Sequence, residues 1–134
     1  MAKYKKKLDA DIRCPLEYGL TIFGGKSGEY PQKLYKALMN SQTVLTVWDD
    51  ARLVGLICVL DDSEMLAQIH YVLVHPEYQG QGIAGRMVEY IKEKYKNFMY
   101  LELMPEDKNN VPFYEKHGFH VMENGAAMQI CNIN

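Results

Sequence analysis

The sequence predicts a mixed α+β domain in which helices flank a central, mostly antiparallel sheet. Three strand-like segments follow one another with short turns between them. A glycine-rich turn then leads into a long amphipathic helix, and another strand follows that helix. Strands joined by short turns pair antiparallel, whereas a strand, a helix and a second strand in succession form a parallel pair. A meander that runs into a β-α-β unit gives this fold class.

The segments before the glycine-rich turn are a helix and three strands: Gln32–Asn40, Thr43–Trp48, Arg52–Leu60 and about Met65–His75. The helix places Leu34 and Leu38 on one apolar face. The first two strands are rich in β-branched residues and flank the turn Asp49-Asp50, which predicts a hairpin. The third strand ends at Pro76, because proline has no N–H to donate to a neighbouring strand.

The segments after the turn are two helices and three strands: about Gly82–Tyr95, Phe98–Met104, Asn110–His117, Phe119–Met122 and Ala127–Ile133. The inward-facing positions of the longer helix are Ile83, Met87, Tyr90 or Ile91, and Lys94 or Tyr95. Asn110 is a candidate N-cap of the second helix, with Pro112 in its first turn. The last two segments are expected to be the closing strands of the sheet.

Composition excludes some classes of function. The chain has 134 residues, a net charge of −2 and a pI of about 6.1, so it has no global positive field to hold nucleic acid. The basic run consists of Lys3, Lys5, Lys6 and Lys7, and we interpret it as a solvated N-terminal strand or tail.

Cysteine content and hydropathy indicate the compartment. The three cysteines are odd in number and widely spaced: Cys14, Cys58 and Cys131. This pattern suits neither a disulfide framework nor a zinc site, so we expect no metal. There is no apolar run long enough to span a bilayer and no signal-peptide pattern at the start. We therefore expect a cytoplasmic protein that has no membrane partner.

The chemistry is expected in the segment His75–Met87, where a strand ends, glycines cluster and a helix begins. Gly80, Gly82 and Gly85 permit positive φ and remove the Cβ atoms that would keep a ligand away. The first N–H groups of a helix are unpaired, and its dipole favours an anion. The amides of Gln79–Gly85 are therefore candidates to bind a diphosphate.

Three other interpretations of this segment exist. The glycines can serve only to turn the chain. A Walker P-loop needs Lys and Ser or Thr after its last glycine, but the residues here are Gly82-Ile83-Ala84. The spacing of Gly80, Gly82 and Gly85 matches a dinucleotide-binding fingerprint. However, three strands in a meander precede it, whereas the fingerprint opens a parallel doubly wound sheet.

Two segments together resemble the GNAT acetyltransferase family. Gln79-Gly80-Gln81-Gly82-Ile83-Ala84 is similar to the family's acyl-CoA motif, Gln/Arg-x-x-Gly-x-Gly/Ala, and Val72–Tyr78 resembles the strand that precedes it. Asn110–Phe119 resembles the C-terminal Asn-x-x-x-Phe-Tyr-x-x-x-Gly-Phe segment. The resemblance covers about Gln32 to the C-terminus and implies one GNAT-like domain over residues 1–134, with residues 1–31 as an atypical N-terminal segment.

The resemblance implies that acetyl-CoA is the cosubstrate, with no metal. In such enzymes the diphosphate lies on loop amides, here those of Gln79, Gly80, Gln81, Gly82, Ile83, Ala84 and Gly85. The pantetheine arm adds to a strand edge, here the backbone of Val72, Leu73 and Val74. Asn110 and Tyr114 are implied to lie near the thioester. Arg86 or Lys116 is a candidate contact for the 3′-phosphate.

The implied reaction is direct attack in a ternary complex by a primary amine of a small molecule or peptide. An N–H of the strand that precedes the glycine-rich turn, such as that of Val74, would polarise the carbonyl, and Tyr114 would be the general acid. His70 is a candidate base, with Glu64 and Glu102 as rivals. The alternative is a CoA-binding regulatory or interaction module with little catalysis. A homodimer is compatible with exposed sheet edges.

The N-terminal part departs from the family pattern. Cys14–Lys26 is similar to the opening of HxlR-type winged-helix regulators, with a Cys-Pro-x-x-Tyr…Gly-Gly-Lys pattern, but the winged helix that should follow is absent. We therefore do not expect a DNA-binding role. Tyr18, Phe23 and Tyr30 are candidates to line the acceptor pocket or to pack in the core.

Overall fold

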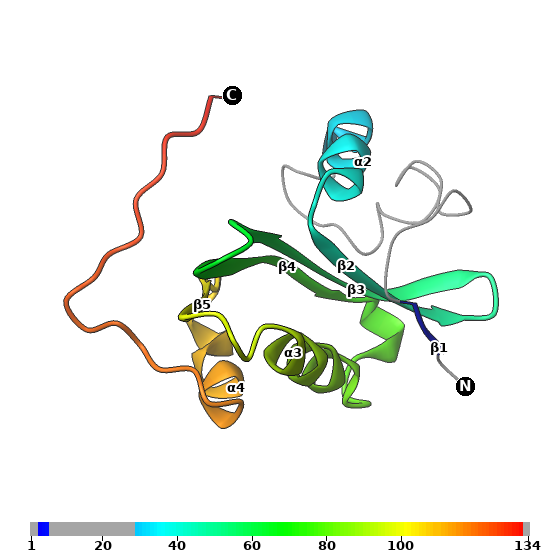
Figure 1. Ribbon diagram of the computed structural model, residues 1–134. Coiled ribbons are helices and arrows are strands. Elements are labelled where there is room, and N and C mark those ends of the chain that lie inside the picture. The colour runs from blue at the N-terminus through cyan, green and yellow to red at the C-terminus, as the bar shows by residue number, and fades with distance from the viewer. Residues whose placement is uncertain (1–2, 6–28, 133–134) are drawn as a thin grey trace. The chain divides into compact units, whose positions relative to one another are not determined.

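The computed structural model describes residues 3–5 and 29–132 (Figure 1). The chain divides into two compact units, Met1–Leu103 and Met104–Asn134, and each is described by itself. Most of the atypical N-terminal segment 1–31, including Cys14, Tyr18 and Phe23, lies outside the described residues.

The first unit contains a five-stranded sheet with the order β1-β2-β3-β4-β5. Its strands are β1 (Lys3–Lys5), β2 (Thr43–Asp49), β3 (Arg52–Asp61), β4 (Leu66–Val74) and β5 (Tyr100–Leu103). Each strand pairs antiparallel with the next, except that β4 and β5 are parallel. The predicted meander and β-α-β unit are confirmed, and the start of the basic run forms an edge strand.

Aspartates form both turns of the meander. In the β2–β3 turn Asp50 has a positive φ of 52°, which aspartate tolerates better than most residues. In the β3–β4 turn one carboxylate oxygen of Asp62 accepts hydrogen bonds from the N–H groups of Glu64, Met65 and Leu66. These bonds favour the charged form and lower the pKa of Asp62. The turn that leads into β4 is therefore fixed locally.

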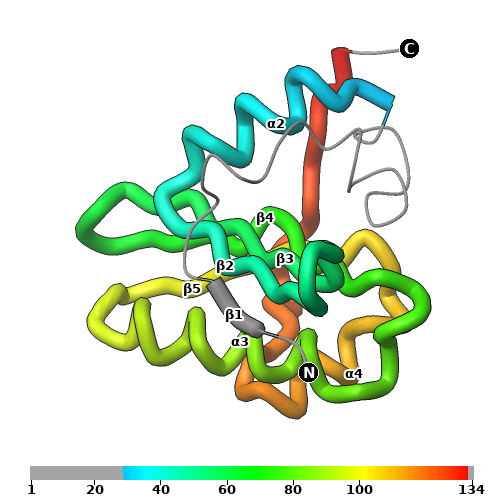
Figure 2. Tube along the Cα trace, turned by 90° about the vertical axis from the view of Figure 1, so that its right-hand side faces the viewer, coloured from blue at the N-terminus to red at the C-terminus, as the bar shows by residue number. Residues whose placement is uncertain are grey.

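Helices cover both faces of the sheet, α2 (Pro31–Met39) on one and α3 (Ile83–Lys94) on the other (Figure 2). A buried cluster lies beneath α2 and consists of Leu34, Leu38, Val44, Trp48, Leu53, Leu56 and Cys58. On the opposite face α3 buries Ile83, Met87, Val88 and Ile91. A Cβ on Gly55 would lie 3.0 Å from the side chain of Ile83, so this glycine lets α3 approach β3 closely.

The end of α3 is tied to the sheet by a buried tyrosine. The hydroxyl of Tyr95 lies 2.6 Å from the hydroxyl of Thr43 and donates to a carboxylate oxygen of Asp61, also at 2.6 Å. Burial, followed by the bond to Asp61, raises the pKa of Tyr95 to about 12. The phenol thus joins the start of β2, the end of β3 and the end of α3.

The second unit holds two short helical segments, a 3₁₀ turn η3 (Lys108–Asn110) and α4 (Val111–Lys116). Asn110 occupies the N-cap position of α4, but its side chain makes no capping hydrogen bond, because its own backbone is already helical. The carboxylate of Asp107 instead accepts from the N–H of Asn109. The predicted helix is confirmed, whereas the predicted cap is wrong.

The predicted closing strands are not formed among the described residues. Phe119–Met122 and the described part of Ala127–Ile133 have no strand assignment. Val121, Met122, Met128 and Ile130 are exposed, Met128 to 93%. A strand needs a partner for its backbone groups, and no other described strand pairs with these segments. Their apolar patterning alone therefore gave a wrong prediction.

Candidate active site

β4 separates from β5 halfway along its length. Residues Leu66–Ile69 pair with Tyr100–Leu103, whereas Tyr71–Val74 pair only with β3. Within the part of the chain that the structure describes, one edge of Val72–Val74 therefore has no strand partner. An extended edge with unpaired N–H and C=O groups can accept a peptide-like ligand.

The direction of the backbone groups along this edge follows from two hydrogen bonds. The N–H of His75 donates to the carbonyl of Val54 on β3 at 2.8 Å. Backbone groups alternate in direction along a strand, so those of Val74 and Val72 point away from β3. The side-chain amide of Gln79 donates to the carbonyl of Val74 at 3.2 Å, which agrees with this direction. The N–H groups of Val72 and Val74 therefore face the open edge.

A β-bulge separates the open part of β4 from its paired part. Cys58 pairs with Tyr71 and Val59 pairs with Ile69, so His70 has no opposite residue on β3. The rings of His70 and Tyr71 lie 4.2 Å apart, and Tyr71 packs against the cluster beneath α2. The bulge interrupts the alternation of side chains along β4 between His70 and Val72. Sequence periodicity contains no signal for this extra residue.

The glycine-rich turn has the backbone that its sequence predicts. It follows a 3₁₀ turn, η2 (Pro76–Tyr78). Gly80 has a φ of 81° and Gly82 a φ of 82°, both in the left-handed region. A Cβ built on either glycine would meet no atom within 4 Å. The space in front of the turn is therefore open, and the glycines are needed for their backbone conformation and for this access.

The first turn of α3 presents its backbone amides to the same loop. The first hydrogen bond of the helix runs from the N–H of Arg86 to the carbonyl of Gly82 at 3.1 Å. The N–H groups of Ile83, Ala84 and Gly85 consequently lack intrahelical acceptors. α3 has twelve residues, so its dipole adds to the attraction for an anion. The loop and helix start fit a diphosphate without any basic side chain.

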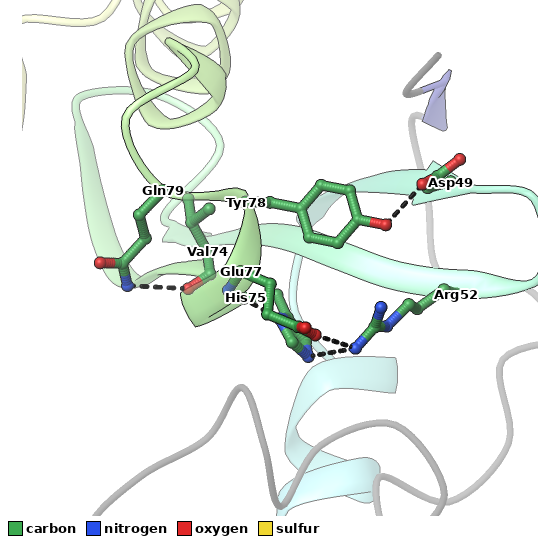
Figure 3. A network of polar contacts seen from close by, with 7 residues as sticks. All are labelled: Asp49, Arg52, Val74, His75, Glu77, Tyr78 and Gln79. Atoms are coloured by element: carbon green, nitrogen blue, oxygen red, sulfur yellow. Dashed lines mark hydrogen bonds and ion pairs between the residues drawn. The ribbon is translucent and has the colours of Figure 1, made fainter.

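A polar network that the sequence did not reveal joins η2 to the β2–β3 hairpin (Figure 3). Arg52 forms an ion pair with Glu77, and Tyr78 donates a hydrogen bond to Asp49. The ion pair raises the pKa of Arg52, and the bond to Asp49 raises that of Tyr78. His75, which directly precedes η2, is buried. Arg52 and Glu77 are 25 residues apart in the chain, and Asp49 and Tyr78 are 29 residues apart. Local sequence patterns therefore give no signal for these contacts.

Tyr114 and Asn110 belong to the second unit. The ring of Tyr114 lies 5.0 Å from that of Phe113 and 6.0 Å from that of Phe119, so it packs between two aromatic neighbours. The side chain is half-buried, and desolvation raises the pKa of its hydroxyl. The phenol therefore keeps its proton at neutral pH. Asn110 is exposed.

Glu64 and Glu102, the other two candidates for the general base, lie in different environments. Glu64 is exposed in the β3–β4 turn, where its N–H donates to Asp62. Glu102 is half-buried on β5 and pairs with Gln68 on β4, on the paired side of the bulge.

Residues 3–5 and 29–132 contain no group of three or more His, Cys, Asp or Glu side chains arranged to hold a metal ion. Over the same residues, no helix has the length and apolar character required to cross a membrane.

Comparisons with known proteins extend the similarity toward the N-terminus. The acetyltransferase (GNAT) family matches residues 16–119, so the match begins before Gln32, where the sequence resemblance began. The resemblance of Cys14–Lys26 to HxlR-type regulators finds no support in these comparisons.

Individual relatives agree with this family. An uncharacterized N-acetyltransferase in the lysA 3′ region of Bacillus methanolicus is 34% identical over 117 residues, which are 87% of this chain and 92% of that protein. A GNAT family acetyltransferase from Streptococcus pneumoniae has a TM-score of 0.75 at 25% identity, covering 100% of this chain and 98% of that one. A GNAT acetyltransferase from Elizabethkingia anophelis with acetyl-CoA bound has a TM-score of 0.68 at 18% identity, covering 90% and 77%.

The separated strands, the open glycine turn at the start of a helix and the family match over most of the chain agree, and the chain belongs to the GNAT family of N-acetyltransferases.

Proposed function

We propose that this chain transfers the acetyl group of acetyl-CoA to a primary amine of a small molecule or peptide, by direct attack in a ternary complex. One observation supports this most strongly. The unpaired edge of β4 at Val72–Val74 leads through η2 directly into the open turn around Gly80 and Gly82. The backbone groups that could pair with a strand-like arm therefore lie next to the amides that could bind a diphosphate.

The residues of this site match the two parts of the cosubstrate. The N–H groups from Gln79 to Gly85 would hold the diphosphate, because helix-start amides and positive-φ glycines together form an anion-binding concavity. The outward N–H groups of Val72 and Val74 and the outward C=O of Val72 would pair with the amides of the pantetheine arm, while the C=O of Val74 accepts from Gln79. When bound, acetyl-CoA supplies an activated thioester carbonyl. The structural relative from Elizabethkingia anophelis contains bound acetyl-CoA, which supports this assignment.

The N–H of Val74 and the hydroxyl of Tyr114 have the chemistry that the transfer requires. The N–H of Val74, which faces the open edge, would polarise the acetyl carbonyl. Tyr114 would donate its phenolic proton to the departing thiolate, and its raised pKa keeps that proton available. Asn110 would lie near the thioester, as the family resemblance implies. Holding the amine and the carbonyl together would supply much of the rate.

We propose His70 as the general base that receives the proton of the attacking amine. It is an exposed imidazole at the bulge where β4 leaves β5. Bulges next to active sites commonly direct a side chain toward the ligand. Glu102 remains the rival, because it is half-buried on the facing strand. We also propose that residues 1–134 act as a single catalytic domain.

The experiment is calorimetric titration of the purified chain with CoA and acetyl-CoA, together with thiol release from acetyl-CoA over a panel of primary amines. Saturable binding and amine-dependent thiol release would support the proposal. Saturable binding with no release on any amine would instead favour a CoA-binding regulatory module. Absence of binding would reject both functions.

A further inference from the structure

The β2–β3 hairpin is fastened to the segment that immediately precedes the glycine turn (Figure 3). Asp49 ends β2 and Arg52 begins β3, so the two residues flank the hairpin turn. Their partners Glu77 and Tyr78 lie in η2, and Gln79 follows directly. Any movement of η2 would therefore displace the first residues of the proposed diphosphate site.

The contacts between the two elements are of several kinds. Arg52 pairs with Glu77, lies 3.2 Å from Nε2 of His75, and places its guanidinium carbon 5.6 Å from the centre of the Tyr78 ring. That separation is within the range of a cation–π contact. The hydroxyl of Tyr78 donates to Asp49. Tyr78 is thus held at its ring face and at its hydroxyl by residues on both sides of the hairpin turn.

The buried residue His75 also contacts η2. Its backbone N–H donates to Val54, and its Nδ1 accepts from the N–H of Glu77 at 3.1 Å. Its ring lies edge-on to that of Tyr78, with centres 5.7 Å apart. The buried imidazole therefore fixes the entry into η2, while Arg52 and Asp49 fix its exit.

The exposed ion pair of this network is better suited to holding η2 in place than to stabilising the whole fold. The side chains of Arg52 and Glu77 are 51% and 65% exposed. Ion pairs this exposed contribute little to the free energy of folding. Binding by backbone amides, in contrast, is strongest when the amides are already in place before the ligand arrives.

We propose that Asp49, Arg52 and Tyr78 are positioning residues that hold η2 against the hairpin, so that the amides of Gln79–Gly85 converge on the diphosphate. This inference rests on the proposed function of that loop. The three residues touch the loop's support and not the ligand. They act by lowering the cost of ordering the loop when CoA binds.

The test compares Arg52→Met and Tyr78→Phe with the wild type. Each removes the polar contact and keeps most of the side-chain volume. Lys96→Met is the matched control, because Lys96 and Glu93 form another exposed ion pair, at 2.7 Å, near the other end of α3. Asp49→Asn is the conservative variant, since its amide oxygen can still accept from Tyr78. Dissociation constants for CoA, melting temperatures and amide hydrogen exchange of residues 79–85 are measured for each.

We expect Arg52→Met and Tyr78→Phe to raise the dissociation constant for CoA by about five- to tenfold, the scale of one hydrogen bond. Amide exchange over residues 79–85 should accelerate, while exchange in the centre of α3 stays unchanged. Lys96→Met should change neither quantity, and Asp49→Asn should remain within about twofold of wild type. A loss of affinity without faster exchange in the loop would point to direct ligand contact and overturn the positioning role.

Two further outcomes separate this inference from the proposed function. If the wild type binds CoA and both variants bind it equally well, the positioning role is wrong and the proposed function stands. If the wild type does not bind CoA, both are wrong.

Discussion

Replacing Gly82 with valine should abolish CoA binding while the protein stays folded. Gly82 has a φ of 82° and is the N-cap of α3. A left-handed backbone costs a residue with a Cβ about 1–2 kcal/mol. No atom lies within 4 Å of that Cβ position, so the Cβ itself meets no neighbour in the free protein. We expect the melting temperature to fall by a few degrees, roughly 3–8 °C.

The loss of binding should be much larger than the loss of stability. The valine side chain would stand in the open space that the diphosphate is proposed to occupy. Losing two amide hydrogen bonds to a charged group costs about 3–6 kcal/mol. This corresponds to a ~10²–10⁴-fold increase in the dissociation constant for CoA, measured by calorimetry.

A second left-handed position provides the control for this prediction. Ser63 has a φ of 72° in the β3–β4 turn. Ser63→Val puts a β-branched side chain into the same kind of backbone outside the proposed site, and CoA affinity should remain within about twofold. If folded Gly82→Val bound CoA as tightly as the wild type, the loop amides would not be the diphosphate site.

Three further predictions concern single side chains. Tyr114→Phe should lower turnover about 10²-fold or more, the scale of lost general-acid catalysis, and leave CoA affinity nearly unchanged; unchanged turnover would remove Tyr114 from the mechanism. Tyr95→Phe should reduce the free energy of unfolding in urea by about 1–3 kcal/mol, because Thr43 and Asp61 lose a buried partner. The folded pKa of Tyr95 is about 12 against 10.0 for the free side chain, so its stabilising contribution should be present below pH 10 and disappear as the pH rises through 12. An unfolding free energy of Tyr95→Phe that paralleled the wild type from pH 8 to 12 would contradict this linkage. Asp62→Ala should lower the melting temperature at pH 7, and the difference should vanish as the pH falls below 3.8 and through the lowered folded pKa; a constant difference would mean that the charge is irrelevant.

The sequence predicted the central part of the fold well, because its signals are local. Thr43–Trp48 and Arg52–Leu60 are short β-branched segments around an aspartate turn, and they form the predicted hairpin. Ile83, Met87 and Ile91 of α3 are buried at the positions that the helical period predicted. Gly80 and Gly82 adopt the positive φ that made them candidates for a ligand-binding turn.

The features that the sequence did not reveal depend on residues far apart in the chain. The bulge at His70 arises from the register with β3, and two strands with the same alternation can pair with or without it. The contact of Tyr78 with Asp49 spans 29 residues and involves residue types that are common on any surface. Ala127–Ile133 has the composition of a strand, but composition does not supply the partner that a strand requires.

We propose that backbone amides of residues 79–85, together with the open edge of β4, hold acetyl-CoA. Titration of the ¹⁵N-labelled chain with CoA, followed by amide NMR shifts, tests it most directly. We expect the largest shift changes from Gln79 to Gly85 and at Val72 and Val74, with the same saturation curve. Saturable changes confined to other residues, or no changes at all, would contradict it.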